Sequence, residues 1–313
     1  MRTTKKVKIA YLISVHTDAI QLGRMIRALY QGDDTYFFIH VDAKCNQADF
    51  ETVIPEMCKK NVLFTCNRYW IQWGGFNQVL YQRELLSLCL SSKISFDRIF
   101  LLTGQDYPLI SNEDINKELS ENPSKEYIIG LNISDIDNPP KIKKKLVLYH
   151  FFRDLRTSYK IKKIFSGISR IIMTILPIRK KTYLVIDGVK WPVYQSSAMM
   201  CITYTLANYI LEKLSDKQIV NYFRYSFAPD EMVLPTIIFN SPYRKNCLLY
   251  EKESYDGLKT LSAITYFNYG KEIQTFTLSN YDELKNCRKM FARKFVTDVS
   301  DSLMDKLDNE HGL

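Results

Sequence analysis

The sequence predicts an α/β fold in which helices flank a mostly parallel central sheet. Short apolar runs rich in β-branched residues alternate with helix-periodic segments through the first half of the chain, which is the pattern of strand–helix–strand units. The chain has 313 residues, of which 46% are hydrophobic and 25% are charged. A chain of this size and composition can hold a core without disulfides or metal. We expect one domain over residues 1–313.

The expected strands are too short for buried helices but have the length and composition of strands. They span residues 8–15, 36–41, 61–64, 98–102 and 127–131. Ligands of parallel sheets bind beyond the carboxyl ends of the strands, so the residues that follow each run are candidate site residues.

Helical patterns separate these strands and continue through the second half. Thr17 or Asp18 can cap a first helix, and Asn77 can cap a second. A further apolar stretch covers 232–238, and 298–307 resembles a closing amphipathic helix. The periodic apolar residues are Ile20, Leu22, Met25, Ile26 and Leu29 in the first helix, Val79, Leu86 and Leu90 in the second, and Leu206, Ile210 and Leu214 in a third.

The positive charge of the chain is concentrated in one segment. The formal net charge is +9, but residues 139–181 carry +12 and the remainder carries −3. Within 161–181, apolar residues recur beside basic ones at helical spacing, which suits an interfacial helix on an anionic membrane or a cover over an acidic ligand. A solvated basic face on an ordinary packed helix is an equal alternative. We expect 139–181 to be an insertion between two halves, about 1–135 and 182–313.

The cysteines give no sign of a disulfide framework or a zinc site. There are seven of them, an odd number, and none forms a Cys-x-x-Cys pair. We expect reduced and partly buried thiols.

Three short segments after expected strands carry candidate binding residues. Asp42 ends the second run, where its carboxylate can accept hydrogen bonds from a ligand or simply start a turn. Trp73 precedes Gly74 and Gly75, a combination that offers an aromatic plane and close backbone approach, although a packed loop Trp is equally plausible. Asp106 follows the run 98–102, and Pro108 prevents a helix from continuing there.

Six segments in order resemble one family. They are His-Val-Asp-Ala-Lys at 40–44, Trp-Gly-Gly at 73–75, Thr-Gly-Gln-Asp-Tyr-Pro-Leu at 103–109, Gln-Ser-Ser-Ala-Met-Met at 195–200, Phe-Ala-Pro-Asp-Glu at 227–231 and Met-Phe-Ala-Arg-Lys-Phe at 290–295. Together they resemble the core-2/I-branching β-1,6-N-acetylglucosaminyltransferases and peptide O-xylosyltransferases. The resemblance implies a GT-A-type, Rossmann-like nucleotide-sugar-binding fold and covers nearly the whole chain except the basic segment.

The resemblance implies an inverting, metal-independent transfer of a sugar from a UDP-sugar to an acceptor hydroxyl, which would give a β-linkage. Such a transfer needs a base for the hydroxyl proton and positive charge for the leaving diphosphate. The resemblance implies that Glu231 is the base and that Arg293 and Lys294 bind the diphosphate. It also implies that the second half of the chain carries the acceptor-binding and catalytic residues. The other donor-side residues are Asp42, Trp73, Gly74 and Asp106, and the acceptor-side residues are Gln195, Ser196, Ser197 and Asp230.

The donor and acceptor are less constrained than the reaction. N-acetylglucosamine is the first expectation for the donor sugar and xylose is the next. The chain departs from the family at Ala198 to Met200, where an aromatic residue is usual, and at Phe227-Ala228, where Ser usually precedes Pro-Asp-Glu. The acceptor is therefore open among a glycan, a lipid-linked glycan and a protein, with surface polysaccharide or glycan synthesis as the expected setting.

One segment argues for a metal. Asp135-Ile136-Asp137 has the Asp-x-Asp spacing by which most GT-A enzymes hold a divalent ion, but it precedes Asn138-Pro139-Pro140 in an expected turn and lies outside the matching segments. We expect no metal and no cofactor. A carbohydrate- or nucleic-acid-binding protein on the same fold is the alternative function, although the localised basic charge gives no reason to expect nucleic acid.

The expected location is cytoplasmic, with a possible peripheral contact at the inner face of an anionic membrane through 139–181. The short apolar run 9–15 lacks a cleavage site, and no stretch reaches the roughly 20 apolar residues of a membrane span. Animal members of the family carry a signal anchor, so this pattern favours a bacterial member.

Overall fold

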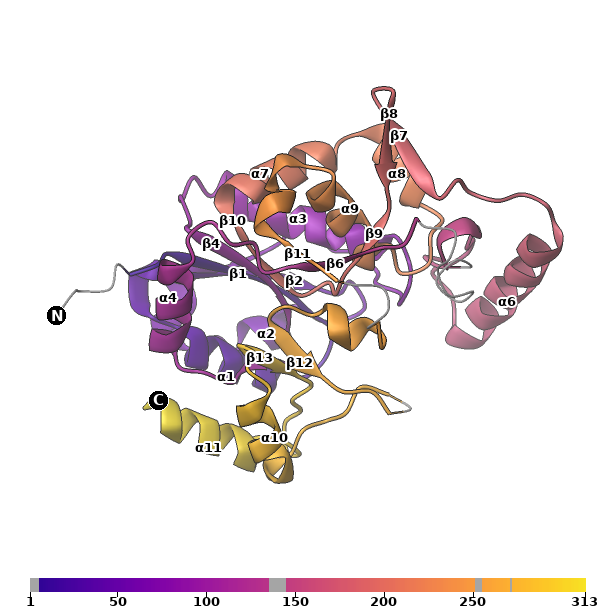
Figure 1. The fold of residues 1–313 in the computed structure, drawn as a ribbon. Helices are drawn as coiled ribbons and strands as arrows, with labels where there is room; N and C mark the ends of the chain where they lie inside the picture. The colour runs from indigo at the N-terminus through magenta and orange to yellow at the C-terminus, as the bar shows by residue number, and fades with distance from the viewer. Residues whose placement is uncertain (1–5, 135–144, 251–254, 271) are drawn as a thin grey trace.

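A computed structural model describes residues 6–134, 145–250, 255–270 and 272–313 (Figure 1). The strands are β1 (Ile9–Val15), β2 (Thr35–Val41), β3 (Val62–Phe64), β4 (Arg98–Thr103), β5 (Asp106–Pro108), β6 (Ile129–Asn132), β7 (Tyr183–Ile186), β8 (Val189–Pro192), β9 (Tyr194–Gln195), β10 (Met200–Thr203), β11 (Leu248–Leu249), β12 (Thr265–Phe267) and β13 (Phe291–Arg293).

Helices connect and cover these strands. They are α1 (Ala19–Leu29), α2 (Ala48–Glu51), α3 (Asn77–Ser91), α4 (Asn112–Glu121), α6 (Tyr159–Ile175), α7 (Tyr204–Lys213), α8 (Lys217–Phe223), α9 (Val233–Phe239), α10 (Tyr281–Asn286) and α11 (Asp301–His311). A 3₁₀ turn, η3 (Pro229–Glu231), leads into α9.

The central sheet confirms the predicted fold class. Its strand order is β10-β4-β1-β2-β3, and β4, β1, β2 and β3 run parallel. Ile9 of β1 lies opposite Thr35 of β2 on one side and Arg98 of β4 on the other. Only the edge strand β10 is antiparallel among the paired strands of this sheet that the structure describes.

One strand expected from the sequence lies outside the central sheet, and one strand of this sheet was not predicted. The run 127–131 forms a strand, β6, but this strand joins β9 and β11 in a separate three-stranded sheet. Tyr127 makes only an isolated bridge to Cys201, because β10 already occupies the edge of the central sheet beside β4. The strand β10 itself was not predicted, since its four residues Met-Cys-Ile-Thr are too few to show an alternation.

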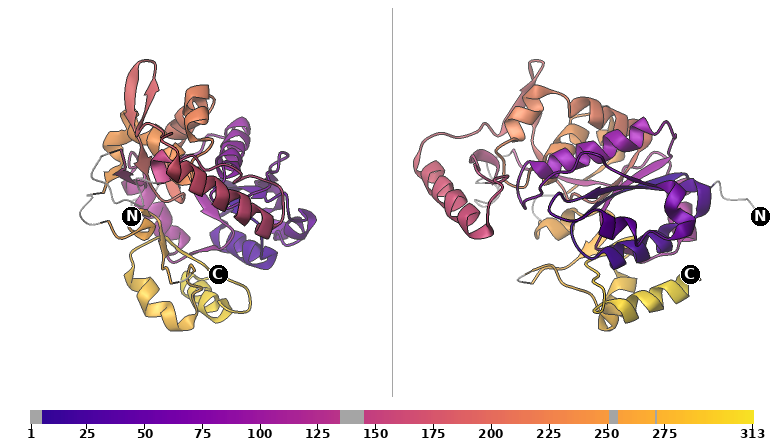
Figure 2. Two further views of the ribbon diagram at one scale, coloured as in Figure 1. Left: turned by 90° about the vertical axis from the view of Figure 1, so that its right-hand side faces the viewer. Right: turned by 180° about the vertical axis from the view of Figure 1, so that it is seen from behind.

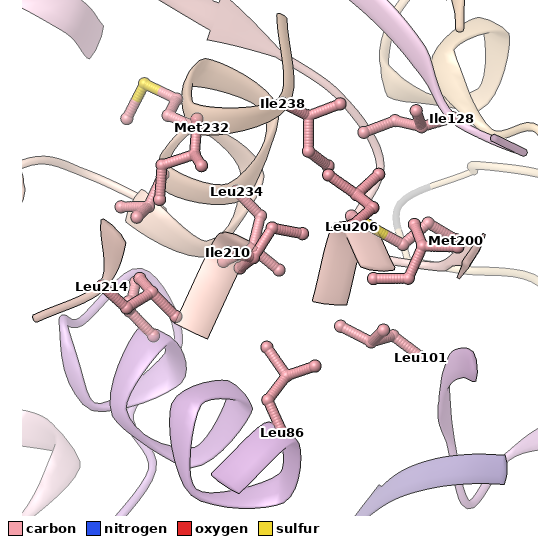
Figure 3. Packing of buried hydrophobic residues seen from close by; sticks show 14 of the residues in the cluster. Leu86, Leu101, Ile128, Met200, Leu206, Ile210, Leu214, Met232, Leu234 and Ile238 are labelled. Carbon is pink, nitrogen blue, oxygen red and sulfur yellow. The ribbon is translucent and has the colours of Figure 1, made fainter. Parts of the chain in front are cut away.

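Apolar side chains cover both faces of the central sheet. On one face, residues of α3, α7 and α9 pack with β4 and β10; Figure 3 shows Leu86, Leu101, Leu206, Ile210 and Leu234 converging there. On the other face, residues of α1, β13 and α11 pack with β1, β2 and β4. The central strands are buried on both sides, which is why they read as continuous apolar runs.

The C-terminal part of the chain is attached to the central sheet through β5. The strand β13 pairs antiparallel with β5 and parallel with β12. In Figure 1 these strands lie with α10 and α11 on the α1 side of the sheet. The pairing places Arg293 directly opposite Asp106, 187 positions earlier in the chain.

The predicted helix caps are confirmed in part. Asp18 caps α1 by accepting a hydrogen bond from the Gln21 N–H. Asn77, expected as a cap, is instead the first residue of α3. Asp154 accepts hydrogen bonds from the N–H groups of Phe76 (2.8 Å) and Asn77 (3.2 Å), so the cap of α3 comes from the basic segment.

The glycine in β6 generates a stability prediction. A Cβ at Gly130 would lie 2.2 Å from Cε2 of the buried Phe239 ring. We expect Gly130→Ala to lower the free energy of unfolding by about 1–3 kcal/mol, measured by urea unfolding, because the ring must shift in a packed core.

The matched control is Gly167→Ala in α6, where nothing lies within 4 Å of the added Cβ. It should leave the free energy of unfolding unchanged or raise it by less than about 1 kcal/mol. Equal stabilities of Gly130→Ala and the unaltered chain would contradict this description of the core.

Candidate active site

The carboxyl ends of β1, β2 and β4 meet at one edge of the central sheet because these strands are parallel neighbours. His16 follows β1, Asp42 follows β2 and Asp106 follows β4. Three polar residues therefore lie at one edge, where ligands of such sheets bind, and two of them, Asp42 and Asp106, are predicted site residues.

Asp42 is buried and held in a defined orientation. Its Oδ1 accepts hydrogen bonds from the N–H groups of Lys44 (3.0 Å) and Ile71 (3.3 Å), and its Oδ2 lies 3.1 Å from Lys44 Nζ. The Ile71 contact ties β2 to the loop that leads to Trp73. The carboxylate is thus fixed by its own turn and by the following loop together.

The buried Asp106 and the half-buried Arg293 form a pair across the β5–β13 ladder. Asp106 Oδ2 accepts a hydrogen bond from the Thr103 N–H at 2.8 Å. Its Oδ1 lies 3.7 Å from Arg293 Nη1, and neither of these two atoms has a hydrogen-bond partner among the described residues. Burial raises the pKa of Asp106 to about 6, although Arg293 and the Thr103 hydrogen bond act in the opposite direction.

Glu231 lies at the end of η3, the short turn that starts at Pro229. Ala228, just before this turn, has left-handed backbone angles with φ of 48°. The Ser196 N–H donates to the Glu231 carbonyl at 2.9 Å. Pro229 fixes the first residue of the turn, so the turn presents the Glu231 side chain at a set position.

The Glu231 carboxylate has two partners at the same oxygen. Lys145 Nζ forms an ion pair with Oε2, and Gln195 Nε2 donates to Oε2 at 3.1 Å. Among the described residues, no hydrogen bond engages Oε1. Lys145 comes from the basic segment, which therefore contributes to the site.

Asp230 is connected to the Trp73–Gly74 loop through one glutamine. Gln78 Nε2 donates to Asp230 Oδ2 at 3.1 Å, and Gln78 Oε1 accepts from the Gly74 N–H at 2.5 Å. The Ala228 N–H donates to the Gly74 carbonyl at 3.2 Å. Burial and the neighbouring Glu231 charge raise the pKa of Asp230. These contacts place Gly74 beside the segment that carries Glu231.

Trp73 is exposed and stands beside an aromatic and cationic cluster. Its ring meets the Phe227 ring edge-on, with centroids 4.9 Å apart, and the Arg153 guanidinium lies 4.4 Å from the Phe227 centroid. Gly74 has a φ of 75°, and a Cβ there would lie 2.8 Å from the Phe227 ring. Phe227, a departure from the family pattern, thus occupies the space beside the glycine.

Shared electrostatic neighbours connect the Asp106 side of the site to the Glu231 side. Burial raises the pKa of Tyr269, Glu231 raises it further and Arg293 lowers it. Burial likewise raises the pKa of Tyr81, whose other neighbours include Asp230, Arg293 and Asp106. Each tyrosine hydroxyl therefore lies within electrostatic range of Arg293 and of one acid of the Pro229–Glu231 turn. Tyr81 and Tyr269 thus have electrostatic neighbours both among the residues assigned to the base segment and among those assigned to the diphosphate.

Several buried polar atoms around this site have no hydrogen-bond partner among the described residues. Besides Asp106 Oδ1 and Arg293 Nη1, they include Gln195 Oε1 and Asp230 Oδ1. Buried polar atoms are rarely left without partners in folded proteins. A polar ligand with its own donors and acceptors would satisfy this group.

Not every predicted site residue faces an open space. Ser196 and Ser197 are buried, and their hydroxyls are used internally: Ser196 Oγ donates to the Leu261 carbonyl at 3.5 Å, and Ser197 Oγ accepts from the Met199 N–H at 3.3 Å. Their contact with an acceptor stays a prediction, and what the structure gives them is a role in positioning the chain beside Glu231. Lys294 follows Arg293 and is half-buried.

Sequence reasoning missed four residues of the site. Lys145 lies in a segment that was read as an insertion, and Gln78, Tyr81 and Tyr269 belong to none of the matching segments. Gln78 had a weak signal, because it lies in the first turn of the predicted second helix, shortly after the Trp-Gly-Gly segment. Asp135-Ile136-Asp137 lies outside the described residues, and among the described residues no cluster of three or more His, Cys, Asp or Glu could hold a metal ion.

Fold and site together define a sheet-edge binding site of the kind that α/β transferases use. The family model described as "Core-2/I-Branching enzyme" matches residues 9–298. The chain belongs to the Core-2/I-Branching enzyme family. Its mostly parallel central sheet with helices on both faces agrees with the predicted α/β fold class.

Curated relatives carry two kinds of name. Rat "Xylosyltransferase 2" is 26% identical over 96% of this chain and 33% of its own length. Mouse "Beta-1,3-galactosyl-O-glycosyl-glycoprotein beta-1,6-N-acetylglucosaminyltransferase 4" is 25% identical over 76% of this chain and 48% of its own length. The chain thus spans about a third to a half of the length of these relatives.

A solved structure, mouse "Xyloside xylosyltransferase 1, apo form", is similar with a TM-score of 0.34 and 11% identity, covering 77% of this chain and 84% of that one. The site described above rests on the chain's own geometry.

The buried Asp106 generates a pH prediction. In the native state its pKa is raised from 3.8 to about 6, so the native state binds more protons than the unfolded state between these values. The free energy of unfolding should therefore fall as pH rises through this window. We expect Asp106→Asn to remove about 1–3 kcal/mol of that fall, measured by urea unfolding at the two ends of the window.

Asp298→Asn is the matched control, because Asp298 is exposed and Asn tolerates its left-handed backbone, with φ of 67°. If Asp106→Asn changed stability by the same amount at both ends of the pH window, Asp106 would not carry the raised pKa.

Proposed function

We propose that this chain is a glycosyltransferase that moves a sugar from a UDP-sugar to an acceptor hydroxyl with inversion at the anomeric carbon and without a metal. The observation that carries the proposal is the combination of a half-buried arginine, Arg293, whose buried Nη1 has no hydrogen-bond partner, with a carboxylate, Glu231, whose Oε1 is unengaged among the described residues. Family membership supports the reaction class, since both named groups of relatives are glycosyltransferases.

The donor would bind along the carboxyl edge of the sheet. Asp42 is oriented there by two backbone donors and can accept hydrogen bonds from a nucleoside. Trp73, Gly74 and Asp106 complete the proposed donor side. The loop that carries Trp73 is hydrogen-bonded at Ile71 to Asp42 and at Gly74 to Ala228, three residues before Glu231. A donor bound along this loop would therefore lie between Asp42 and the proposed base.

Arg293 and Lys294 would stabilise the leaving diphosphate. As the bond between the anomeric carbon and the diphosphate oxygen breaks, the electron pair stays with UDP and its negative charge grows. Arg293 Nη1 is an unused donor in a buried setting, where a charge-assisted hydrogen bond to phosphate is strong. Asp106 opposite it would hold the guanidinium plane.

Glu231 would act as the base. The acceptor oxygen forms the new bond to the anomeric carbon from the face opposite UDP, and its proton passes to the carboxylate. Lys145 and Gln195 both hold Oε2, which orients the carboxyl group and leaves Oε1 as the atom to receive the proton. Attack on an α-linked donor from this side gives a β-linked product.

For the donor sugar we propose N-acetylglucosamine first and xylose next. The relatives include both activities by name, with the xylosyltransferases matching more of this chain. A glycan, a lipid-linked glycan or a protein could supply the acceptor hydroxyl, and Phe227 beside Trp73 is the residue that would shape an acceptor surface different from the family pattern.

The Glu231→Gln variant separates a transferase from a carbohydrate- or nucleic-acid-binding protein on the same fold. Gln has almost the same shape but cannot take the proton, so we expect the turnover of UDP-N-acetylglucosamine or UDP-xylose to fall about a hundredfold to ten-thousandfold with unchanged affinity for UDP. Product release is measured as free UDP, and affinity by calorimetric titration.

Glu212→Gln serves as the matched control, because Glu212 lies on α7 with a 72% exposed side chain. It should retain full turnover. Absence of turnover in the unaltered chain with every UDP-sugar and acceptor class, despite UDP binding, would favour the binding-protein alternative.

A further inference from the structure

The helix α6 has an apolar face and a basic, polar face. Its apolar residues recur every three or four positions, which puts them on one side of the helix. The remaining positions include Lys160, Lys163 and Arg170, all exposed. We call the apolar side the α6 apolar face; it consists of Ile161, Ile164, Phe165, Ile168, Ile171, Ile172 and Ile175.

The α6 apolar face points to solvent, the reverse of what a surface helix of a globular protein does. The exposed fractions of its residues run from 45% at Ile172 to 77% at Ile175. The residues of α6 that are covered lie on another side of the helix: Ser169 is buried, and Ser166 and Met173 are half-buried. Figures 1 and 2 show α6 standing away from the central sheet. The side of α6 that is covered therefore includes two serines and one methionine, whereas the isoleucines and Phe165 stay exposed.

The segment holds this orientation through contacts at both ends. Before the helix, Phe152 packs on Phe165, with ring centroids 5.7 Å apart. After it, the Arg179 guanidinium donates to the carbonyls of Met173 and Thr174. The buried Lys180 then donates to Ser226 Oγ at 2.5 Å, directly before Phe227. The exposure of the apolar face is therefore part of a defined local structure.

Charge distinguishes between the possible partners of this face. Residues 139–181 carry a net charge of +12, so two copies of α6 packed face to face would bring like charges together. A bilayer with anionic headgroups complements both the apolar face and the positive charge. The apolar face can insert between the headgroups and the acyl chains, and the flanking cations can pair with lipid phosphates. None of the described helices is long and apolar enough to cross a membrane.

We propose that α6 is an interfacial anchor that binds the surface of an anionic lipid membrane through its apolar face and flanking cations. The segment around the anchor also reaches the candidate active site: Arg153 lies over Phe227, Asp154 caps α3 and Lys145 pairs with Glu231. Docking of α6 would therefore hold the Trp73 and Phe227 side of the candidate active site near the lipid surface. The inference does not depend on the proposed reaction, because it rests on the exposure and charge of α6 alone.

Vesicle flotation of the full chain tests the anchor. We expect binding to phosphatidylcholine vesicles that contain phosphatidylglycerol, and loss of most of this binding at high salt or with phosphatidylcholine alone. The triple variant Ile164→Ser, Ile168→Ser and Ile171→Ser should reduce the partition coefficient by at least about tenfold. The double variant Lys160→Gln and Lys163→Gln should reduce it by about fivefold per charge.

The matched control removes exposed apolar side chains elsewhere, through Met57→Ser, Leu278→Ser and Val299→Ser. It should bind vesicles like the unaltered chain, and circular dichroism should show all variants folded. No binding to anionic vesicles, equal binding to neutral vesicles, or equal binding by the Ile triple variant would overturn the proposal. A stable dimer by light scattering that the Ile triple variant abolishes, without vesicle binding, would overturn it in favour of self-association.

Discussion

The pairing of β13 with β5 is the constraint on which the site depends. It connects a strand near the C-terminus to the residues that follow the central strand β4, and its register sets Arg293 opposite Asp106. Phe291 and Phe295 on either side of this position are fully buried, so the pairing is held by the core as well as by the ladder. Without it, the sheet edge would carry acids at Asp42 and Asp106 and would lack the half-buried cation that the proposed reaction uses to stabilise an anionic leaving group.

A second set of contacts assembles the base. The turn Pro229–Glu231 and the preceding Ala228 are held by the Gly74 carbonyl, by Gln78 through Asp230 and by the Ser196 N–H. These contacts come from two separate parts of the chain, residues 74–78 and Ser196. Lys145 then adds a cation from the segment that also carries α6. The basic segment therefore contacts the site through Lys145 and also contains the exposed helix α6. One segment thus combines an ion pair to the proposed base with the proposed membrane contact.

The sequence predicted the parts of the structure in which local pattern and tertiary environment agree. The strands β1, β2 and β4 are buried on both faces, so their apolar runs were unambiguous, and Asp18 capped α1 as expected. The assignment of β6 to the central sheet failed because strand pairing depends on which edge is free.

The site segments were recognisable through the family resemblance, whereas Lys145 and Tyr269 could not be found, because only tertiary contacts bring them to Glu231. The exposure of α6 could not be predicted either, since the same periodicity describes a helix that buries its apolar face.

The central claim is that Arg293 and its neighbours, rather than a metal ion, hold the diphosphate of the donor. Calorimetric titration of UDP into the full chain, once in excess EDTA and once with manganese, tests it most directly. We expect one binding event of the same affinity in both conditions, because in the proposed mechanism the cation that meets the diphosphate is part of the chain. Binding that appears only with manganese would contradict the account and would move the diphosphate to a metal site.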